Sequence, residues 1–522
     1  MHEVVEFSDR VSCTIALQSQ SVSALSTDHL HADLRRRSVR GGMVNLVSQG
    51  TQFLIQSVAT VVLARLLTPA DFGLVAMVAT ITGLGQAFAD LGLSEATIQR
   101  KEITNDQVST LFWINLAIGV GLMLVTMGLA PFLAWFYRDA RLVGITLMLS
   151  LTFLFGGLRV QADAVLKRQM RFSSLAVRDI ISYLVAVPTA IILAMKGASY
   201  WALVALPLTL NFTQMSLSWL MVNWRPGLPR RDAEVGSMIA FGGNVAASYL
   251  ILNVSRSADN VLIGWHWGAG PLGLYSRAYN LLMLPVRQLS TPAGSVAVPA
   301  FSRTQDDPER FARYYLRTVN LILWISAPVF GYLFVAAHPV ITLMLGHQWG
   351  EAAPVFQILT ISALGQLLLD STTWLLVSRG QSRRLLKLLL IFSPILVCSY
   401  AVGLPFGIKG VAFSGSVVML LILPWMLRFS FQETALNLSR LGRAIFYPVA
   451  LSLAGVFTAG LVLRLAGPTN AISELFVAAV GFLAAYGLSA LIPAVRREAL
   501  SLRNLVSEFR SPLSTSTETV GE

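Results

Sequence analysis

The sequence predicts an all-α polytopic membrane protein with about fourteen transmembrane helices, and three observations support this fold class. The chain has 522 residues, of which 55% are hydrophobic and only 13% are charged, whereas a soluble domain carries about 25% charged residues. Its mean hydropathy is +0.64. Apolar stretches of about 20 residues, the length that a helix needs to span hydrocarbon, recur along the chain. Backbone amides must be satisfied inside each span, so these stretches are expected to be helices.

Polar, glycine-rich or proline-rich residues separate the apolar stretches. Each apolar stretch between two such separators is a predicted span. These are 42–64, 75–95, 108–136, 142–162, 176–195, 200–222, 236–264, 273–300, 317–337, 353–377, 385–403, 408–427, 444–463 and 472–493.

Basic residues mark one side of the predicted membrane. Of the 39 Lys and Arg residues, 29 fall in the tails and in alternate loops, six in the opposite loops and four within spans. Positively charged loops stay in the cytoplasm, so both termini are predicted to be cytoplasmic. The net charge of +12 is thus spread over short loops and does not indicate a nucleic-acid partner.

A short motif occurs twice, 200 residues apart. The stretch LLTPADFGLV (66–75) follows the first span, and WGAGPLGLYS (267–276) follows the seventh. Six spans separate these outer turns, so the second copy starts on the same side as the first, as in a parallel repeat about the membrane normal. A weaker echo joins 157–168 to 365–379. Tight turns need Gly and Pro for backbone reasons, so the repeated residues are expected to be structural.

The repeat predicts two pseudo-symmetric six-helix bundles followed by two further helices. The predicted domains are a disordered cytoplasmic tail at 1–40, an N-lobe at 41–225, a C-lobe at 226–430, two C-terminal spans at 431–495 and a cytoplasmic tail at 496–522.

The chain lacks the motifs of an enzyme. No P-loop, HExxH or GxSxG sequence occurs, and the outer loops are about ten residues or fewer. The two cysteines, Cys13 and Cys398, are too far apart in sequence to form a metal motif. We therefore expect a non-enzymatic protein with no metal and no cofactor.

A polar stripe in the first span is one part of the candidate site. Asn45, Gln49, Gln52 and Gln56 are spaced by four, three and four residues, which places them on one helix face. Such a stripe is costly against lipid. It is expected either to hydrogen-bond to another span or to line a water-filled cavity, and we favour the cavity.

Three arginines in the seventh and eighth spans are the second part. They are Arg256, Arg277 and Arg287, and Asp259 shares a helix face with Arg256. A guanidinium can donate two parallel hydrogen bonds to phosphate oxygens, so the arginines are candidate ligands of a diphosphate. The structural alternative is an ion pair of Asp259 with Arg256 or Arg277, or a snorkelling Arg277.

Carboxylates inside spans are candidate ion sites. Asp90 lies in the second span and Asp370 deep in the tenth, and a buried carboxylate can carry a proton or bind a cation. For Asp90 we favour capping or pairing near the inner end of its span. Arg159, near the cytoplasmic end of the fourth span, is expected to snorkel.

Several motifs together resemble a known family. They are LARLLTPADFGLVAMV (63–78), FADLGLSEATIQRKEITNDQVSTLFWINLAIG (88–119), LGLYSRAYNLLMLP (272–285) and VPAFSR (298–303). They resemble the polysaccharide transporter family, the Wzx-type flippase group of the multidrug/oligosaccharidyl-lipid/polysaccharide exporter superfamily, and in particular its colanic-acid exporter branch. The resemblance covers about residues 40–495.

The resemblance implies that the protein flips an undecaprenyl-diphosphate-linked oligosaccharide across the bacterial inner membrane by alternating access. It also implies a central cationic cavity, for which Arg256, Arg277 and Arg287 are the candidates. The expected partners are the lipid-linked oligosaccharide and membrane lipid, with a polysaccharide polymerase and co-polymerase as candidate protein partners, and the expected state is a monomer. The alternatives are an ion-coupled, multidrug-type antiporter and a membrane polymerase or ligase.

Overall fold

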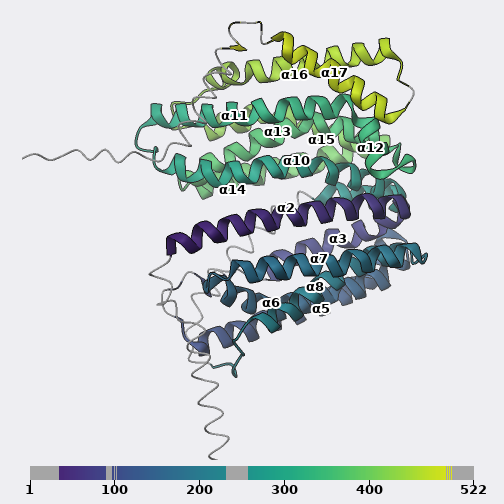
Figure 1. Ribbon diagram of the computed structural model, residues 1–522, viewed down its shortest axis with the longest axis vertical. Coiled ribbons are helices and arrows are strands. Elements are labelled where there is room, and N and C mark those ends of the chain that lie inside the picture. Colours follow the sequence, from purple (N-terminus) through teal and green to yellow (C-terminus); the bar gives the residue numbers. More distant parts are fainter. Residues whose placement is uncertain are drawn as a thin grey trace, which may run out of the picture. The chain divides into compact units, whose positions relative to one another are not determined.

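The computed structural model describes residues 34–89, 94, 97–98, 100, 103–230, 257–468, 470–489, 491, 493 and 495–496. All regular structure in these residues is helical, which confirms the predicted all-α class (Figure 1). The chain divides into two compact units, Met1–Ser276 and Arg277–Glu522, called unit 1 and unit 2 below.

Unit 1 is a bundle of long helices. The described helices of this unit are α2 (Leu34–Leu66), α3 (Pro69–Ala89), α5 (Asn105–Tyr137), α6 (Arg141–Arg168), α7 (Phe172–Met195), α8 (Tyr200–Met221), the helical residues 257–267 and the first turns of α10 (Ala269–Ser302).

Unit 2 contains the rest of α10 and the C-terminal helices. These are α11 (Pro308–Val335), α12 (Ala337–Leu345), α13 (Ala352–Ser378), α14 (Ser382–Gly403), α15 (Gly407–Ser430), α16 (Leu438–Ala466) and α17 (Ala471–Ser489). The connection at 336–351 contains the short apolar helix α12, so it is longer than the roughly ten residues expected of every outer loop.

Nine described segments are long and apolar enough to cross a membrane, and one of them, Ser382–Ser430, covers both α14 and α15. The apolar stretch described within α3 is Pro69–Gly83. The predicted span 236–264 lies mostly outside the described residues. Composition and length therefore establish a multi-pass membrane protein, while the full set of fourteen spans stays a prediction.

Small residues set the helix spacing in unit 1. A Cβ added to Gly119 of α5 would lie 2.7 Å from the carbonyl oxygen of Phe153, and one added to Gly157 of α6 would lie 2.8 Å from that of Asn115. The two backbones can approach this closely only because both positions are glycine, which is how spans pack when lipid provides no hydrophobic driving force.

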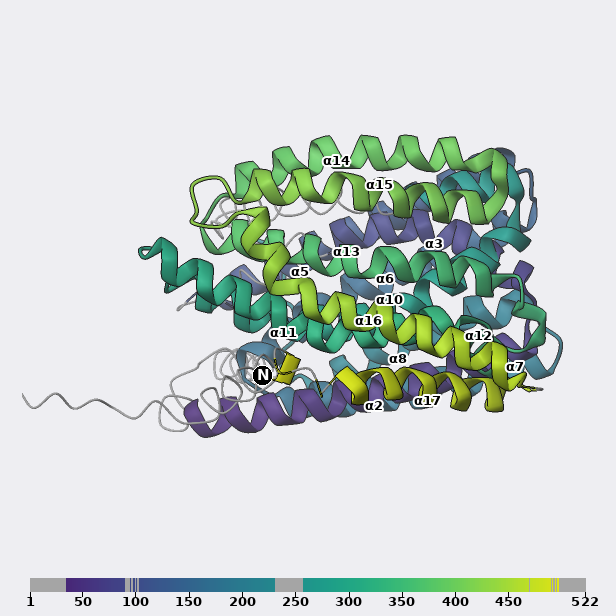
Figure 2. The same cartoon turned by 90° about the horizontal axis from the view of Figure 1, so that it is seen from above.

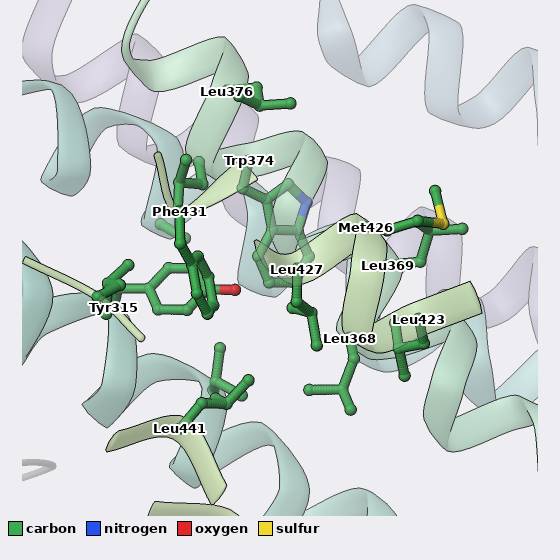
Figure 3. Packing of buried hydrophobic residues seen from close by; sticks show 14 of the residues in the cluster. Tyr315, Leu368, Leu369, Trp374, Leu376, Leu423, Met426, Leu427, Phe431 and Leu441 are labelled. Atoms are coloured by element: carbon green, nitrogen blue, oxygen red, sulfur yellow. The ribbon is translucent and has the colours of Figure 1, made fainter. Parts of the chain in front are cut away.

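Aromatic and aliphatic side chains from α10, α11 and α13–α16 form the core of unit 2 (Figure 3). Tyr315 of α11 lies at its centre, with its ring edge-on to Phe431 at 5.6 Å and its hydroxyl 2.8 Å from that of Ser371. The last two helices join this unit through α11. Ser452 of α16 donates to the carbonyl of Ala327 at 2.6 Å, and the Tyr332 hydroxyl donates to the carbonyl of Leu475 in α17 at 3.1 Å.

The turn after α6 in unit 1 and the turn after α13 in unit 2 have the same backbone conformation and the same hydrogen bonds. Met170 follows α6 with φ of 54°, and its amide donates to the carbonyl of Lys167 at 2.9 Å. Gly380 follows α13 with φ of 65°, and its amide donates to the carbonyl of Val377 at 3.0 Å. The next amides, of Arg171 and Gln381, also donate to equivalent carbonyls, at 3.0 and 2.9 Å. This backbone match supports the weaker of the two sequence echoes.

The two left-handed residues give a test of the turn. Gly380→Ala is expected to lower the free energy of unfolding by about 1 kcal/mol, because an L-residue pays that much in the left-handed region and no neighbour lies within 4 Å of the added Cβ. Met170→Gly relieves the same strain but adds unfolded-chain entropy, so its effect is expected to stay within about 0.5 kcal/mol. Thermal unfolding of the purified protein in detergent measures both. Equal losses in the two variants would contradict this account.

Candidate functional site

Two long helices are too polar to count among the apolar spans. α8 has 22 residues and α10 has 34, yet neither reaches the hydropathy of the nine candidate spans. Polar side chains in helices of this length need protein or water as neighbours, because lipid cannot satisfy them. We therefore expect α8 and α10 to contribute the polar side chains of a ligand site.

Arg287 occupies the middle of α10. It lies 18 residues after Ala269 and 15 residues before Ser302, about 27 and 22 Å from the two helix ends at 1.5 Å per residue. Its side chain is exposed. Within the described part of the chain no carboxylate forms an ion pair with Arg287, so the guanidinium can receive an anion.

A hydrogen-bonded carboxylate lies close to this arginine. Ser290, one turn after Arg287, donates its hydroxyl to Asp370 of α13 at 2.6 Å, and Gln366 donates its side-chain amide to the other oxygen of Asp370 at 3.0 Å. These four residues, Arg287, Ser290, Gln366 and Asp370, are called the α10–α13 polar cluster. The structure thus places Asp370 against the helical turn that follows Arg287, 83 positions earlier in sequence.

Arg277, the other predicted arginine of α10, lies ten residues before Arg287, which is about 15 Å along a helix. Its side chain is half-buried. The two arginines therefore lie at different depths of the same helix and do not share one helical turn.

The predicted polar stripe of α2 is only partly engaged in hydrogen bonds. Gln52 donates to the Ser48 hydroxyl on its own helix at 2.9 Å, while Gln49 and Gln56 are exposed. The side chain of Asn45 lies outside the described residues. Two of the glutamines are thus free to face water or a ligand.

Asp259 is buried and structurally engaged. Its carboxylate accepts hydrogen bonds from the Tyr275 hydroxyl at 2.9 Å and from the Asn260 amide at 2.7 Å. These bonds tie the helical residues 257–267 to the start of α10. Arg256 and Asp90, also predicted as site residues, lie outside the described residues.

Unit 1 contains an ionic network that connects α6, α7 and α8, and the sequence did not predict it. Asp163 of α6 pairs with Arg159 at 3.3 Å and also with Arg178 of α7. Arg178 also pairs with Asp179 at 2.7 Å. On α8, Gln214 donates to Asp179 at 3.0 Å and accepts from Arg159, and the Ser218 hydroxyl donates to Asp163 at 2.7 Å. We call Arg159, Asp163, Arg178, Asp179, Gln214 and Ser218 the α6–α8 ionic network.

The network corrects the expectation that Arg159 snorkels to the cytoplasmic boundary. Its guanidinium instead turns inward to Asp163 and Gln214. Arg178, which the span boundaries placed at a membrane edge, has only 8% of its side chain exposed. The spacing of Arg159 and Asp163, four residues apart on one face, was the available sequence signal. With two arginines and two aspartates the network has no net charge, so it offers no excess cation to an anionic ligand.

Several arginines in loops that are predicted to be cytoplasmic close helix ends. Arg171 donates to the carbonyl of Met221 at the end of α8 at 3.0 Å, and Arg225 donates to that of Val222 at 3.1 Å. Arg384 of α14 donates to the carbonyl of Phe429 near the end of α15 at 3.2 Å. Cations at helix C-termini satisfy free carbonyls and complement the helix dipole. These arginines therefore have structural partners and are weaker candidates for a ligand site.

The repeated corner, predicted to lie on the outer side, is a pair of touching turns inside unit 1. A Cβ on Gly73 would overlap the backbone carbonyl of Ala269, and a Cβ on Gly273 would overlap that of Pro69. The offset of 200 residues relates Pro69 to Ala269 and Gly73 to Gly273, so the contact is reciprocal, as between surfaces related by a two-fold axis. A capping box fixes the first turn: Thr68 donates its amide to Asp71 at 2.9 Å and accepts the Asp71 amide at 3.3 Å.

The described residues contain no group of three or more His, Cys, Asp or Glu side chains that could hold a metal ion. What they contain is an exposed guanidinium beside a hydrogen-bonded carboxylate in unit 2, and a neutral ionic network in unit 1. Of these two features, only the exposed guanidinium of Arg287 suits binding of an anion.

These features define a multi-pass helical membrane protein in which two kinds of turn recur. Its fold resembles that of the "Lipid II flippase MurJ, inward closed conformation", with a TM-score of 0.66, 12% identity, and coverage of 87% of this chain and 99% of that one. The family described as "Polysaccharide biosynthesis protein" matches residues 62–354, and the chain belongs to it. This is the Wzx-like group of the MOP superfamily that the sequence motifs indicated.

Curated relatives match most of the chain. The "Teichuronic acid biosynthesis protein TuaB" of Bacillus subtilis (strain 168) is 27% identical over 78% of this chain and 86% of its own length. The "Lipopolysaccharide biosynthesis protein WzxC" of Escherichia coli (strain K12) is 24% identical over 63% of this chain and 68% of its own. Both similarities extend well beyond the motif blocks.

Removing one member of the α6–α8 ionic network should destabilise the protein. Arg178→Met leaves two aspartates with one arginine, and breaking a buried pair costs about 3–5 kcal/mol. Arg178→Met combined with Asp163→Asn restores neutrality and is expected to recover part of that loss. Thermal unfolding in detergent and membrane abundance measure the effect. Arg141→Gln is the control, because its ion pair is exposed and worth at most about 1 kcal/mol. A loss in Arg178→Met no larger than in this control would refute the structural role.

The reciprocal contact that Gly73 and Gly273 make, called the glycine corner below, gives a second test. Gly73→Ala and Gly273→Ala are each expected to cost about 1–3 kcal/mol, because the added methyl group meets backbone that cannot rotate away. Gly270→Ala is the matched control in the same corner, since no atom lies within 4 Å of its Cβ. The same unfolding measurement applies. If all three variants behaved alike, the close contact would not exist in the protein.

Proposed function

We propose that this protein flips undecaprenyl-diphosphate-linked oligosaccharide units across the bacterial inner membrane, for the synthesis of an extracellular or cell-surface polysaccharide. It acts as a transporter that makes and breaks no covalent bond. Family membership and the resemblance of the fold to a lipid II flippase support this proposal, as do the biosynthetic roles printed in the names of its relatives.

The observation that carries the proposal is Arg287. A lipid-linked diphosphate must move its charge through the low-dielectric part of the protein, where an anion needs a positive partner. Arg287 lies at the middle of α10, is exposed and has no carboxylate partner among the described residues. Ser290 and Gln366, both neutral hydrogen-bond donors, lie in the same cluster. A cationic drug would be repelled by this arginine, which disfavours a multidrug-type antiporter.

We propose ligand contacts for the remaining predicted residues within each unit separately. Arg277, about 15 Å closer to the outer turn along α10, is proposed as a second contact for the diphosphate. Gln49 and Gln56 of α2 are exposed amides that can bind sugar hydroxyls. Asp370 is proposed to hold the α10–α13 polar cluster in place through Ser290.

We also propose that the glycine corner closes the outer side of the transport path. The two turns meet reciprocally, without large side chains between them. Alternating access requires that such a contact form in one state and separate in the other. The cytoplasmic position of both termini, proposed from the charge bias of the loops, places this corner on the outer face.

The first experiment locates the lipid-linked intermediates in a gene-deletion strain. Inverted and right-side-out membrane vesicles are probed with a membrane-impermeant lectin or sugar oxidant. Complete repeat units are expected only on the cytoplasmic face, because flipping is blocked and their synthesis continues. Units that reach the outer face and remain unpolymerised would instead mean that the protein acts after flipping, as a polymerase or ligase.

The second experiment tests Arg287 in the complemented deletion strain. Arg287→Gln is expected to lower polysaccharide export at least about tenfold at normal membrane abundance, since a charge-assisted phosphate contact is lost. Arg287→Lys keeps the charge without the bidentate geometry, so it should be intermediate. Arg313→Gln, an exposed arginine of α11, is the control and should export normally. Wild-type export by Arg287→Gln would exclude this arginine from the substrate path.

A further inference from the structure

A group of cations lies at the end of the α14–α15 hairpin that the charge bias of the loops predicts to be cytoplasmic. The two helices run side by side in Figure 2 and pack against each other. Arg383 and Lys387 lie on α14, four residues apart and so on one face, and Arg428 lies near the end of α15; all three side chains are exposed. They form the α14–α15 basic cluster.

The neighbouring arginines already have partners, whereas these three cations have none among the residues that the structure describes. Arg379 donates to the carbonyl of Glu433 at 3.1 Å, and Arg384 pairs with the Glu433 carboxylate at 3.3 Å. The Glu433 carboxylate is therefore already ion-paired. Within the described residues no ion pair or hydrogen bond involves the Arg383, Lys387 or Arg428 side chain, so the cluster has excess positive charge.

The fold itself does not require these charges. The turn between α13 and α14 has the same backbone geometry as the turn between α6 and α7, with Gly380 in the place of Met170. In the first copy, the residues at the positions of Arg383 and Lys387 are Ser173 and Val177. A hairpin with this turn therefore forms without the cations, which leaves them available for a ligand.

Apolar side chains continue from the cluster toward the middle of the hairpin. Leu386 and Leu390 on α14 and Leu421 on α15 have 41–73% of their surface exposed. Trp425, 42% exposed, lies one turn from Arg428 and stacks on Phe429 with ring centroids 5.8 Å apart. The bond from Arg384 to the Phe429 carbonyl sets the register of the two helices, so Lys387 and Arg428 lie at similar depth. A tryptophan between cations and exposed aliphatic side chains marks a membrane interface.

We propose that the α14–α15 basic cluster is a binding site for the headgroup of an anionic phospholipid of the cytoplasmic leaflet. Lys387, Arg383 and Arg428 would contact the phosphate, Trp425 would lie at the glycerol level, and the acyl chains would follow the exposed leucines. Basic groups between spans on the cytoplasmic side bind such headgroups. The adjoining apolar surface favours a lipid over free phosphate. This site is separate from the α10–α13 polar cluster and does not depend on what the protein transports.

Fluorescence quenching by brominated lipid tests the site. The protein is reconstituted in phosphatidylcholine bilayers that contain either dibrominated phosphatidylglycerol or dibrominated phosphatidylcholine, and the signal of Trp425 is taken as the difference from Trp425→Phe. The wild type should be quenched more strongly by the anionic lipid. The triple variant Arg383→Gln, Lys387→Gln, Arg428→Gln should lose this preference by at least about fivefold in relative binding constant, the effect expected of even one cation near an anionic surface.

The matched control removes three exposed cations elsewhere on the cytoplasmic side. Arg313→Gln, Arg317→Gln, Arg443→Gln changes the net charge equally and should keep the preference. A preference that survives the first triple variant, or that both triple variants lose alike, overturns the site. If the first triple variant does not accumulate, Lys387→Gln alone and the wild type at high salt should both show a weakened preference. Inorganic phosphate added to phosphatidylcholine bilayers should leave Trp425 unchanged, and a response to it would assign the cluster to a free anion.

Discussion

A charged side chain inside a bilayer needs a partner, because hydrocarbon can neither solvate the charge nor satisfy its hydrogen bonds. The two units meet this constraint differently. In unit 1, Arg159 and Arg178 are balanced by Asp163 and Asp179, and Gln214 and Ser218 complete the hydrogen bonds. In unit 2, Arg287 is exposed beside the hydrogen-bonded Asp370 cluster. One arrangement fixes three helices to one another, and the other leaves a cation available for an anionic ligand.

Close backbone contact is the second constraint on this fold. Helices in lipid gain little from burying apolar side chains against each other, so they approach through small residues. Gly119 and Gly157 do this between α5 and α6, and Gly73 and Gly273 do it at the outer corner. The corner differs from the first contact because it is reciprocal. Gly73 meets the carbonyl of Ala269, and Gly273 meets the carbonyl of Pro69, which is the equivalent position. The two copies of the repeated motif therefore contact each other through equivalent residues.

The two similar turns separate features that this backbone geometry requires from features that only one of the turns carries. The turn after α6 and the turn after α13 share their backbone conformation, although one has methionine and the other glycine in the left-handed position. Their flanking side chains differ in charge. Arginines that cap helix ends occur in both units, whereas the exposed cations on α14 have neutral counterparts on α7. Comparing the copies separates structural arginines from candidate ligand-binding ones.

Much of this protein was determined by local sequence. Hydropathy, loop charge and two short echoes predicted a helical membrane protein, its orientation and its repeat, because span length, charge bias and turn chemistry depend on neighbouring residues alone. They also predicted Arg287 and Asp370 as candidate site residues. Only the tertiary structure decided the partners: Ser290 for Asp370, Tyr275 for Asp259, and Asp163 for an Arg159 expected to snorkel. Partner choice depends on the depth and rotation of helices that are distant in sequence, and these are set by packing.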